Sequence, residues 1–414
     1  MKLGEGLEFI YSEDRCYVSK FITGSIEFYV RDKRYVSNCL NTNIQKMLHE
    51  EGFRLAIVVA IPSTAYLQTK ENLLEDVASL NGDRVLPSKL AIILDYSGEA
   101  MTAQDGFYNT VESILDKYDA HIFYCSQGIN FAHRFSCLEK QKGRKFGNFH
   151  SVFTHKWLDF LSRWASIECQ NCGPPTGARN FVCTMHKPRT HRAALLAYFS
   201  AEKLLENNFI SFGGAINKDG QVKLEALEID HIVNRFDLPE SYKTELHNII
   251  DSNTRISVDK QEISRAYDMV FDIPGEAYSN SDFSIVAESD FTNGSIERVT
   301  EKTLKAIIME RPFIILGNPG SLDLLNELGF RTDFVLFGIE YDKLANEAKR
   351  FKRICEIVTS IYALPESDYS VMLAKDYEIA KYNRVVLNDS FPSILDSISS
   401  SSWRLAISGD SSKK

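Results

Sequence analysis

The chain has 414 residues, 44% of them hydrophobic and 25% charged, which is the composition of a folded globular protein. This length exceeds one ordinary hydrophobic core, so we expect two domains. The net charge of -9 argues against indiscriminate coating of nucleic acid, although it is compatible with a local basic surface.

The sequence carries no membrane or export signal. No apolar run approaches the ~20 residues that span a bilayer, and the first residues lack the apolar segment of a signal peptide. We therefore expect a cytoplasmic protein without membrane contact, whose eight cysteines are thiols.

The first half of the chain alternates short apolar runs with amphipathic patterns. Such alternation, with short connections, predicts a parallel, doubly wound sheet with helices between its strands. We expect strands at 54–61, 90–94 and 121–125, and helices at 69–80, 107–117 and 151–167.

A punctuated segment, residues 169–178, is the best linker candidate, and a second α/β pattern follows it. Residues 215–280 are polar, and we assign them no elements. The serine-rich tail from Ser397 is expected to fray. We expect strands at 181–183, 209–212, 284–287 and 313–316, and helices at 191–206, 301–310, 321–328 and 341–362.

The clearest chemical pattern lies where the helix at 301–310 begins. Thr300 stands at its N-cap, and its first turn holds Glu301 and Lys302. Free amide groups and the positive end of the helix dipole favour an anion at this point. The alternative is an ordinary capped helix with a solvated lysine.

A glycine turn follows the next strand. Gly317, Asn318, Pro319 and Gly320 turn tightly into a helix for which Ser321 is a good N-cap. A carboxylate for ribose hydroxyls, a lysine for phosphate and a glycine-rich helix start are what a nucleotide-sugar site requires.

A second anion-binding pattern is the basic segment 187–192, which includes Arg189, His191 and Arg192 at the start of a predicted helix. Cations at a helix start oppose the dipole, and this cost is easier to explain if a phosphate occupies the site. The alternative is a solvated basic turn.

Two of these segments resemble known glycosyltransferases. Residues 299–304 resemble the Tyr-Val-Thr-Glu-Lys-Leu motif of the α-1,3-fucosyltransferase family, and 283–290 is similar to its Phe-Glu-Asn-Ser motif. Residues 181–212 and 299–330 look still more like bacteriophage and large-virus glycosyltransferase-like proteins. Met185 and Ala306 depart from the viral pattern, and these departures bear on the sugar more than on the nucleotide.

The resemblance implies a GT-B fold, with two Rossmann-like, doubly wound domains facing a cleft. It implies that Arg192 and Lys302 contact the donor diphosphate, that Glu301 holds the ribose, and that Glu288 faces the sugar or orders its loop. The full set of expected donor-binding residues is Arg189, His191, Arg192, Glu288, Thr300, Glu301, Lys302, Gly317, Asn318, Gly320 and Ser321.

The acceptor is expected to bind the first domain. Asp95 and Glu99 follow a buried strand there, and a carboxylate could take the proton of an acceptor hydroxyl. The resemblance implies that Glu99 is this base and that the enzyme inverts configuration. A retaining enzyme would depend less on Glu99, and Asp95 is the second candidate.

The densest basic run consists of Lys140, Lys142, Arg144 and Lys145. It is either a solvated loop or a contact for a polyanionic acceptor such as DNA that carries a hydroxymethylated base, with nearby aromatic residues stacking on bases. A glycan or a protein is the other acceptor class.

Cysteines provide a further candidate site. The pairs Cys169–Cys172 and Cys183–His186 could hold zinc. However, Cys183 falls in a predicted core strand, so we expect no metal and no cofactor besides the nucleotide-sugar.

The sequence thus predicts a glycosyltransferase with an acceptor domain at 1–175, a nucleotide-sugar domain at 176–390 and a partly disordered tail at 391–414. The alternative is a catalytically inactive nucleotide-binding or interaction protein with the same fold.

Overall fold

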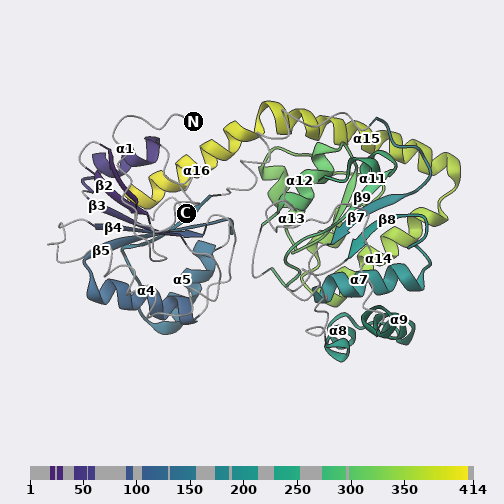
Figure 1. Cartoon of the computed structure of the whole chain (residues 1–414), viewed down its shortest axis with the longest axis horizontal. Coiled ribbons are helices and arrows are strands. Elements are labelled where there is room, and N and C mark those ends of the chain that lie inside the picture. Colours follow the sequence, from purple (N-terminus) through teal and green to yellow (C-terminus); the bar gives the residue numbers. More distant parts are fainter. Residues whose placement is uncertain are drawn as a thin grey trace. The chain divides into compact units, whose positions relative to one another are not determined.

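The computed structural model describes residues 19–23, 26–30, 42–53, 55–60, 90–96, 105–128, 131–154, 173–185, 189–212, 228–251, 273–294 and 298–408 (Figure 1). The chain divides into two compact units. We call them unit 1, which is Met1–Lys156 with Ser393–Lys414, and unit 2, which is Trp157–Pro392. Each unit is an α/β structure with parallel strands.

Unit 1 holds a six-stranded sheet whose strands follow one another in chain order. The first pair is antiparallel, and the later pairs are parallel. The strands are β1 (Ser19–Thr23), β2 (Ile26–Val30), β3 (Leu55–Ala60), β4 (Leu90–Tyr96), β5 (Ala120–Ser126) and β6 (Phe149–Phe153). The three strands predicted here are confirmed. The doubly wound order is not found among the described strands of unit 1, because the chain never reverses direction across the sheet.

Helices cover both faces of this sheet (Figure 1). Alternate side chains of a strand point to opposite faces, so Ile92 and Ile93 of β4 belong to different cores. One core contains residues of α4 (Asp105–Lys117) and α5 (Phe131–Lys142), and the other contains residues of α1 (Thr42–Glu50) and α16 (Phe391–Ser408). The helix predicted at 107–117 is confirmed, and the one at 69–80 lies outside the described residues.

The helix predicted at 151–167 is wrong at its beginning. Residues 149–153 form β6, which pairs with β5 from Ile122 to Ser126. The aromatic spacing that suggested a helix fits a strand equally well over so short a stretch. Residues 155–172 lie outside the described part of the chain.

The C-terminal segment also differs from the expected frayed tail. Helix α16 extends to Ser408, and Trp403 is fully buried in unit 1 with its ring 5.3 Å from that of Phe123. Ser402 Oγ accepts a hydrogen bond of 2.9 Å from the Phe153 amide at the edge of β6. Burial of apolar side chains therefore orders a segment whose serines suggested disorder.

Unit 2 holds a four-stranded parallel sheet in the order β10-β9-β7-β8. The strands are β7 (Phe181–Met185), β8 (Phe209–Phe212), β9 (Phe283–Ala287) and β10 (Phe313–Leu316), and all four were predicted. The chain starts in the middle at β7, adds β8 on one side and then crosses to β9 on the other. This reversal between β7 and β9 is a topological switch point, and parallel α/β sheets bind ligands at the carboxyl ends of strands at such a point.

The predicted helices at 191–206, 301–310 and 321–328 are confirmed with shorter bounds. The helix expected at 341–362 is divided, because Asn346 caps a new helix by accepting from the Lys349 amide. The described helices of unit 2 are α7 (Thr190–Ala201), α8 (Ile229–Phe236), α9 (Glu240–Asp251), α11 (Gly275–Ser279), α12 (Glu301–Ile308), α13 (Ser321–Glu327), the 3-10 helix η3 (Glu340–Lys343), α14 (Glu347–Ala363) and α15 (Glu366–Asp389). Three of them, α8, α9 and α11, fall in the segment 215–280 that the sequence left unassigned.

Candidate functional site

The switch point in unit 2 is occupied by two basic side chains from the first turn of α7. Arg192 donates from Nη2 to the backbone oxygens of Ala287 and Glu288, at 3.0 and 2.9 Å. His191 donates from Nε2 to the same Glu288 oxygen at 2.9 Å. Both side chains are buried. Together they fasten the end of β9 to the start of α7.

The protonation states of these two residues differ. Burial, and then the charge of Arg192, lowers the pKa of His191 well below its usual value, so the ring is neutral at pH 7. Burial, and then the charge of Arg189, lowers the pKa of Arg192 to about 10, so this guanidinium remains cationic. His191 thus orients the backbone, whereas Arg192 also brings positive charge to the switch point.

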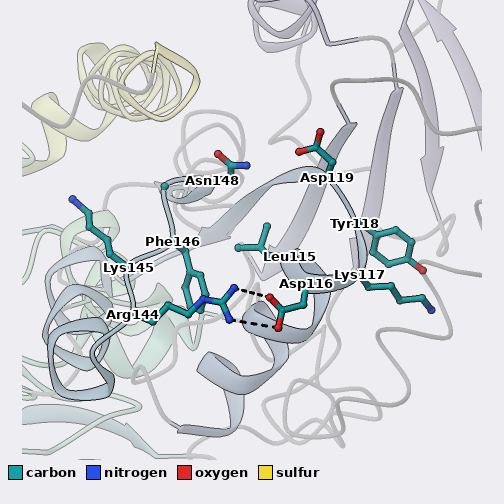
Figure 2. A pocket seen from close by; sticks show the side chains of 10 residues that line it. Leu115, Asp116, Lys117, Tyr118, Asp119, Arg144, Lys145, Phe146 and Asn148 are labelled. Carbon is teal, nitrogen blue, oxygen red and sulfur yellow. Dashed lines mark hydrogen bonds and ion pairs between the residues drawn. The ribbon is translucent and has the colours of Figure 1, made fainter.

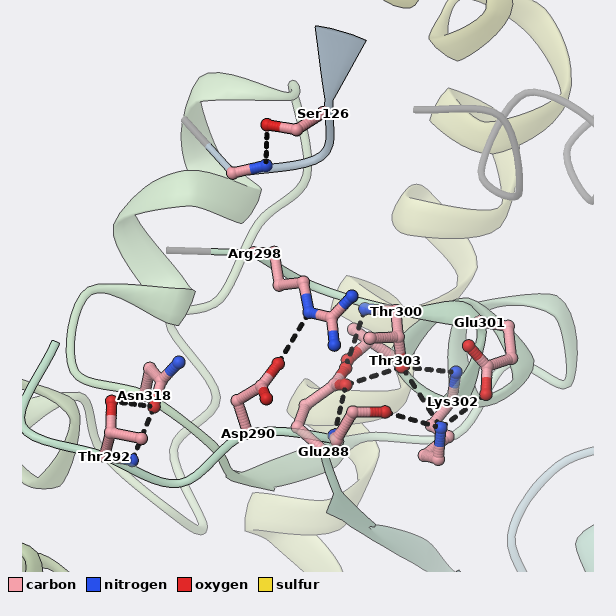
Figure 3. A network of polar contacts seen from close by, with 12 residues as sticks. Ser126, Glu288, Asp290, Thr292, Arg298, Thr300, Glu301, Lys302, Thr303 and Asn318 are labelled. Carbon is pink, nitrogen blue, oxygen red and sulfur yellow. Dashed lines mark hydrogen bonds and ion pairs between the residues drawn. The ribbon is translucent and has the colours of Figure 1, made fainter. Parts of the chain in front are cut away.

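The Glu288 carboxylate, which follows β9, organises the start of α12 (Figure 3). It accepts from the Thr300 amide at 3.0 Å, from the Thr300 hydroxyl at 2.5 Å and from the Thr303 hydroxyl at 2.6 Å. The Ser289 amide donates to it as well, at 3.2 Å. The residue is only 2% exposed. Of the two roles implied for Glu288, its contacts match that of ordering the loop.

Lys302 and Glu301 lie beside this network and are less buried, with side chains 12% and 18% exposed. Lys302 Nζ donates to Glu301, to Ser289 Oγ at 3.3 Å and to Thr300 Oγ1 at 3.4 Å (Figure 3). Thr300 caps α12 as predicted, since its side chain accepts from the Lys302 amide.

The ionisation of Glu301 follows from these neighbours. Burial alone would raise the pKa of Glu301, but the charges of Lys302 and Lys305 outweigh it and hold the pKa below its usual range. Glu301 is therefore an ionised carboxylate at neutral pH. It can accept hydrogen bonds from hydroxyl groups of a ligand.

The start of α7 differs from that of α12. Its N-cap residue is Arg189, which has an extended backbone and an exposed side chain that makes no capping hydrogen bond. Arg235 of α8 reaches the same point: it donates to Thr190 Oγ1 at 2.7 Å and to the Phe291 oxygen at 2.6 Å. It also pairs with Glu347 at 2.6 Å. Arginine side chains thus border the positive end of this helix.

The prediction that Ser321 caps α13 is wrong. Gly320 holds the N-cap position with a φ of 86°, which favours glycine, and Ser321 donates its hydroxyl to the Asn318 oxygen at 2.7 Å. The Leu322 amide is capped instead by a distant carboxylate, Asp342 Oδ2, at 2.9 Å.

The other members of the glycine turn connect the loops after β9 and β10. Asn318 Oδ1 accepts from the amide and the hydroxyl of Thr292, at 2.6 and 3.0 Å. A Cβ on Gly317 would lie 2.8 Å from Ile315 Cγ2 and 3.4 Å from Glu288 Cβ, so only glycine fits there. The turn is therefore a packed junction behind the Glu288 loop.

The expected acceptor side is only partly described. Asp95 lies near the end of β4, where its backbone pairs with Ala60 and Cys125. Glu99 lies outside the described residues. The assignment of either carboxylate as a base stays a prediction.

The predicted basic run begins in α5 and continues into the turn that follows it. Arg144 is engaged within the protein: it pairs with Glu112 at 2.9 Å and with Asp116 at 2.6 Å, and its guanidinium lies 4.9 Å from the centre of the Phe146 ring. Lys140, Lys142 and Lys145 are exposed. Of the four nearby residues that could have stacked on bases, Phe131, Phe135 and Phe146 are buried in the core, and His133 is exposed.

A surface hollow of about 490 Å³ lies beside this run (Figure 2). It is lined by Leu115, Asp116, Lys117, Tyr118, Asp119, Arg144, Lys145, Phe146, Gly147 and Asn148. Asp116 and Arg144 are already paired with each other, and the lining also holds Asp119 and two lysines. The two carboxylates offset part of the charge of the three basic residues, which weakens the attraction of this surface for a polyanion.

Metal ligands do not cluster among the described residues, where no group of three His, Cys, Asp or Glu side chains could hold an ion. Three residues of the zinc alternative, Cys169, Cys172 and His186, lie outside the described residues. Cys183 is buried in β7, and burial raises the pKa of its thiol to about 12.

Three residues that organise this site were not predicted: Arg235, Asp342 and Arg350. Each bonds to backbone groups distant in the sequence. A charged residue in a polar stretch looks the same whether it faces solvent or turns inward, so the sequence offered no signal for them.

Comparisons with known proteins add no relative. No protein-family model, no curated protein and no solved structure matches this chain. Among the helices that the structure describes, none is long and apolar enough to cross a membrane.

Proposed function

We propose that this protein is a glycosyltransferase of GT-B architecture that binds a nucleotide-sugar at the switch point of unit 2. One observation carries the proposal. Arg192, Glu301 and Lys302 converge at the carboxyl ends of two parallel strands where the strand order reverses, which is the usual address of nucleotide sites in such sheets.

The diphosphate would bind at the start of α7. Amide groups of a helix N-terminus attract phosphate, and Arg189 supplies an exposed guanidinium there. Lys302 would reach the same anion from α12, exchanging its contact with Ser289 for a phosphate oxygen. Arg192 would stabilise the anion through its charge while keeping its backbone partners.

Glu301 would accept hydrogen bonds from the ribose hydroxyls, a role for which an ionised and partly exposed carboxylate is suited. The resemblance to fucosyltransferases points to the same role. Glu288 would keep Thr300 and Thr303 in place, so that α12 presents Glu301 and Lys302 in a fixed geometry.

In the proposed reaction, a carboxylate of unit 1, either Glu99 or Asp95, takes the proton from an acceptor hydroxyl. The acceptor oxygen then attacks the anomeric carbon, and the bond from that carbon to the diphosphate breaks. The diphosphate leaves with the bonding electrons, and the cations around α7 offset its charge, so no divalent ion is needed. The acceptor is one of three classes: a glycan, a protein or a hydroxymethylated base in DNA.

A thermal-shift panel of UDP-, GDP- and CMP-sugars tests the proposal. A ligand at ~100 Kd should add roughly 2.7 kcal/mol of stability. Lys302→Ala should weaken binding at least about tenfold, as expected for loss of a charged hydrogen bond. Lys343→Ala is the control, because Lys343 is an exposed lysine at the end of η3 that also pairs with a glutamate. Equal affinities in the two variants would remove Lys302 from the site.

A second assay distinguishes a transferase from the alternative, a nucleotide-binding protein without transferase activity. Glu99→Gln and Asp95→Asn should retain donor binding, and one of them should abolish release of nucleoside diphosphate in the presence of acceptors. Donor binding by the wild-type protein without any such release would favour the inactive alternative.

A further inference from the structure

Arg350 of α14 is fully buried and bonds to backbone oxygens from separate segments. Its Nε donates to Gly317 at 3.0 Å, its Nη2 to Thr292 at 2.5 Å, and its Nη1 to Leu344 and Ala345. Thr292 belongs to the loop after β9, and Gly317 directly follows β10. One guanidinium therefore braces both loops at the carboxyl edge of the sheet.

The same loops are held from other directions. Asn318 accepts from the amide and the hydroxyl of Thr292, and Arg235 donates to the Phe291 oxygen. The Arg350 guanidinium also lies 4.3 Å from the centre of the Phe291 ring. Residues 288–292, at the start of this loop, are thus each held by a hydrogen bond or an ion pair, which is the kind of support that a precisely shaped ligand site requires.

No other side chain offers the set of coplanar hydrogen-bond donors that the Arg350 guanidinium offers. Burial lowers the pKa of Arg350 to about 10, which leaves it charged at neutral pH. A buried cation is costly, and apolar residues of similar volume often stabilise a core at least as well. Its several donors in one plane hold several carbonyl groups at once, whereas a lysine offers a single nitrogen.

We propose that Arg350 is a positioning residue for the nucleotide-sugar: it sets the affinity of the site by fixing the loops after β9 and β10, without touching the ligand. This inference rests on the proposed function, and it adds a determinant of affinity on a helix outside the expected site. The proposal requires that a substitution at Arg350 raises the Kd for the donor by more than a substitution elsewhere that lowers the thermal stability equally.

The test compares Arg350→Lys with Arg384→Lys. Arg384 is a matched control, because it is also buried in unit 2 and also donates to a backbone oxygen, that of Ile308 at 2.9 Å. Two quantities are measured for each variant: amide hydrogen exchange in peptides covering 289–294 and 317–321, and the Kd for the best nucleotide-sugar of the panel. Phe291→Leu is a milder second variant: it removes the ring beside the guanidinium, which also stacks on His191, and leaves the hydrogen bonds of Arg350 in place.

We expect Arg350→Lys to exchange at least tenfold faster in both loops and to bind the donor at least tenfold more weakly, with Phe291→Leu changing both in the same direction. Arg384→Lys should change the Kd less than twofold at a similar loss of thermal stability. Faster exchange with an unchanged Kd, or equal losses of affinity in both arginine variants, would overturn the proposal. If the wild-type protein binds no nucleotide-sugar, the proposed function fails, and the exchange data still test the brace.

Discussion

The carboxyl group that caps α13 offers a sharp test of the electrostatics in unit 2. Asp342 is 3% exposed, and its carboxylate accepts from the Leu322 amide. Burial raises the pKa of Asp342 to about 6, against a usual value of 3.8. Asp342→Asn keeps an oxygen for the amide and removes the titrating charge.

The expected magnitude follows from the shift. The folded protein binds the proton more tightly than the unfolded chain, by about two pKa units, or about 3 kcal/mol. This stabilisation is complete below about pH 4, and it is lost as the pH rises through about 6. The unfolding free energy of the wild-type protein should therefore fall over this window relative to Asp342→Asn, and the difference should be constant above about pH 7.

Denaturant unfolding between pH 4 and 8 measures this difference, with hydrogen exchange in peptides of unit 2 as the readout. Asp376 has a similarly raised pKa of about 6, and because both proteins retain it, its effect cancels in the comparison. Asp323→Asn removes an exposed carboxylate of α13 whose charge helps to raise the pKa of Asp342, so it should move the fall in stability to lower pH without abolishing it. A profile of Asp342→Asn parallel to that of the wild-type protein would refute the reasoning.

Three further predictions concern packing and surface charge. Gly317→Ala should destabilise unit 2 by about 1–3 kcal/mol in thermal unfolding, because its Cβ would lie 2.8 Å from Ile315 Cγ2; an unchanged melting temperature would contradict this. Trp403→Ala should cost about 3–5 kcal/mol and raise hydrogen exchange in unit 1, since the side chain is fully buried; faster exchange confined to the end of α16 would contradict it. Lys145→Ala should lower retention on heparin more than Arg144→Ala, because Arg144 is already paired with carboxylates; the opposite order would show that the ion pairs open.

The strands could be predicted from the sequence because burial on both faces leaves a readable apolar run. All four strands of unit 2 and three of the six in unit 1 were found in this way. The helices α12 and α13 were also found, since polar and apolar residues alternate with the helical period and a threonine or a glycine marks their starts.

Contacts between distant segments could not be predicted. Nothing near Glu288 in the sequence indicates that its carboxylate meets Thr300 and Thr303, twelve and fifteen residues further on. Helix α16 was missed because its serines resemble a disordered tail, whereas Trp403 finds its partners in a sheet formed more than 200 residues earlier.

Two buried carboxylates of unit 2 determine at which helix N-terminus a phosphate can bind. At α12 the Glu288 carboxylate already accepts from Thr300, and at α13 the Asp342 carboxylate already accepts from Leu322. An incoming phosphate would meet a fixed negative charge at either position, at a cost that rises as the surroundings become drier. At α7 the N-cap residue is instead Arg189, a cation without a capping bond. The phosphate is therefore expected at the start of α7 rather than at the Glu301–Lys302 turn, and Lys302 would contribute its side chain rather than its backbone.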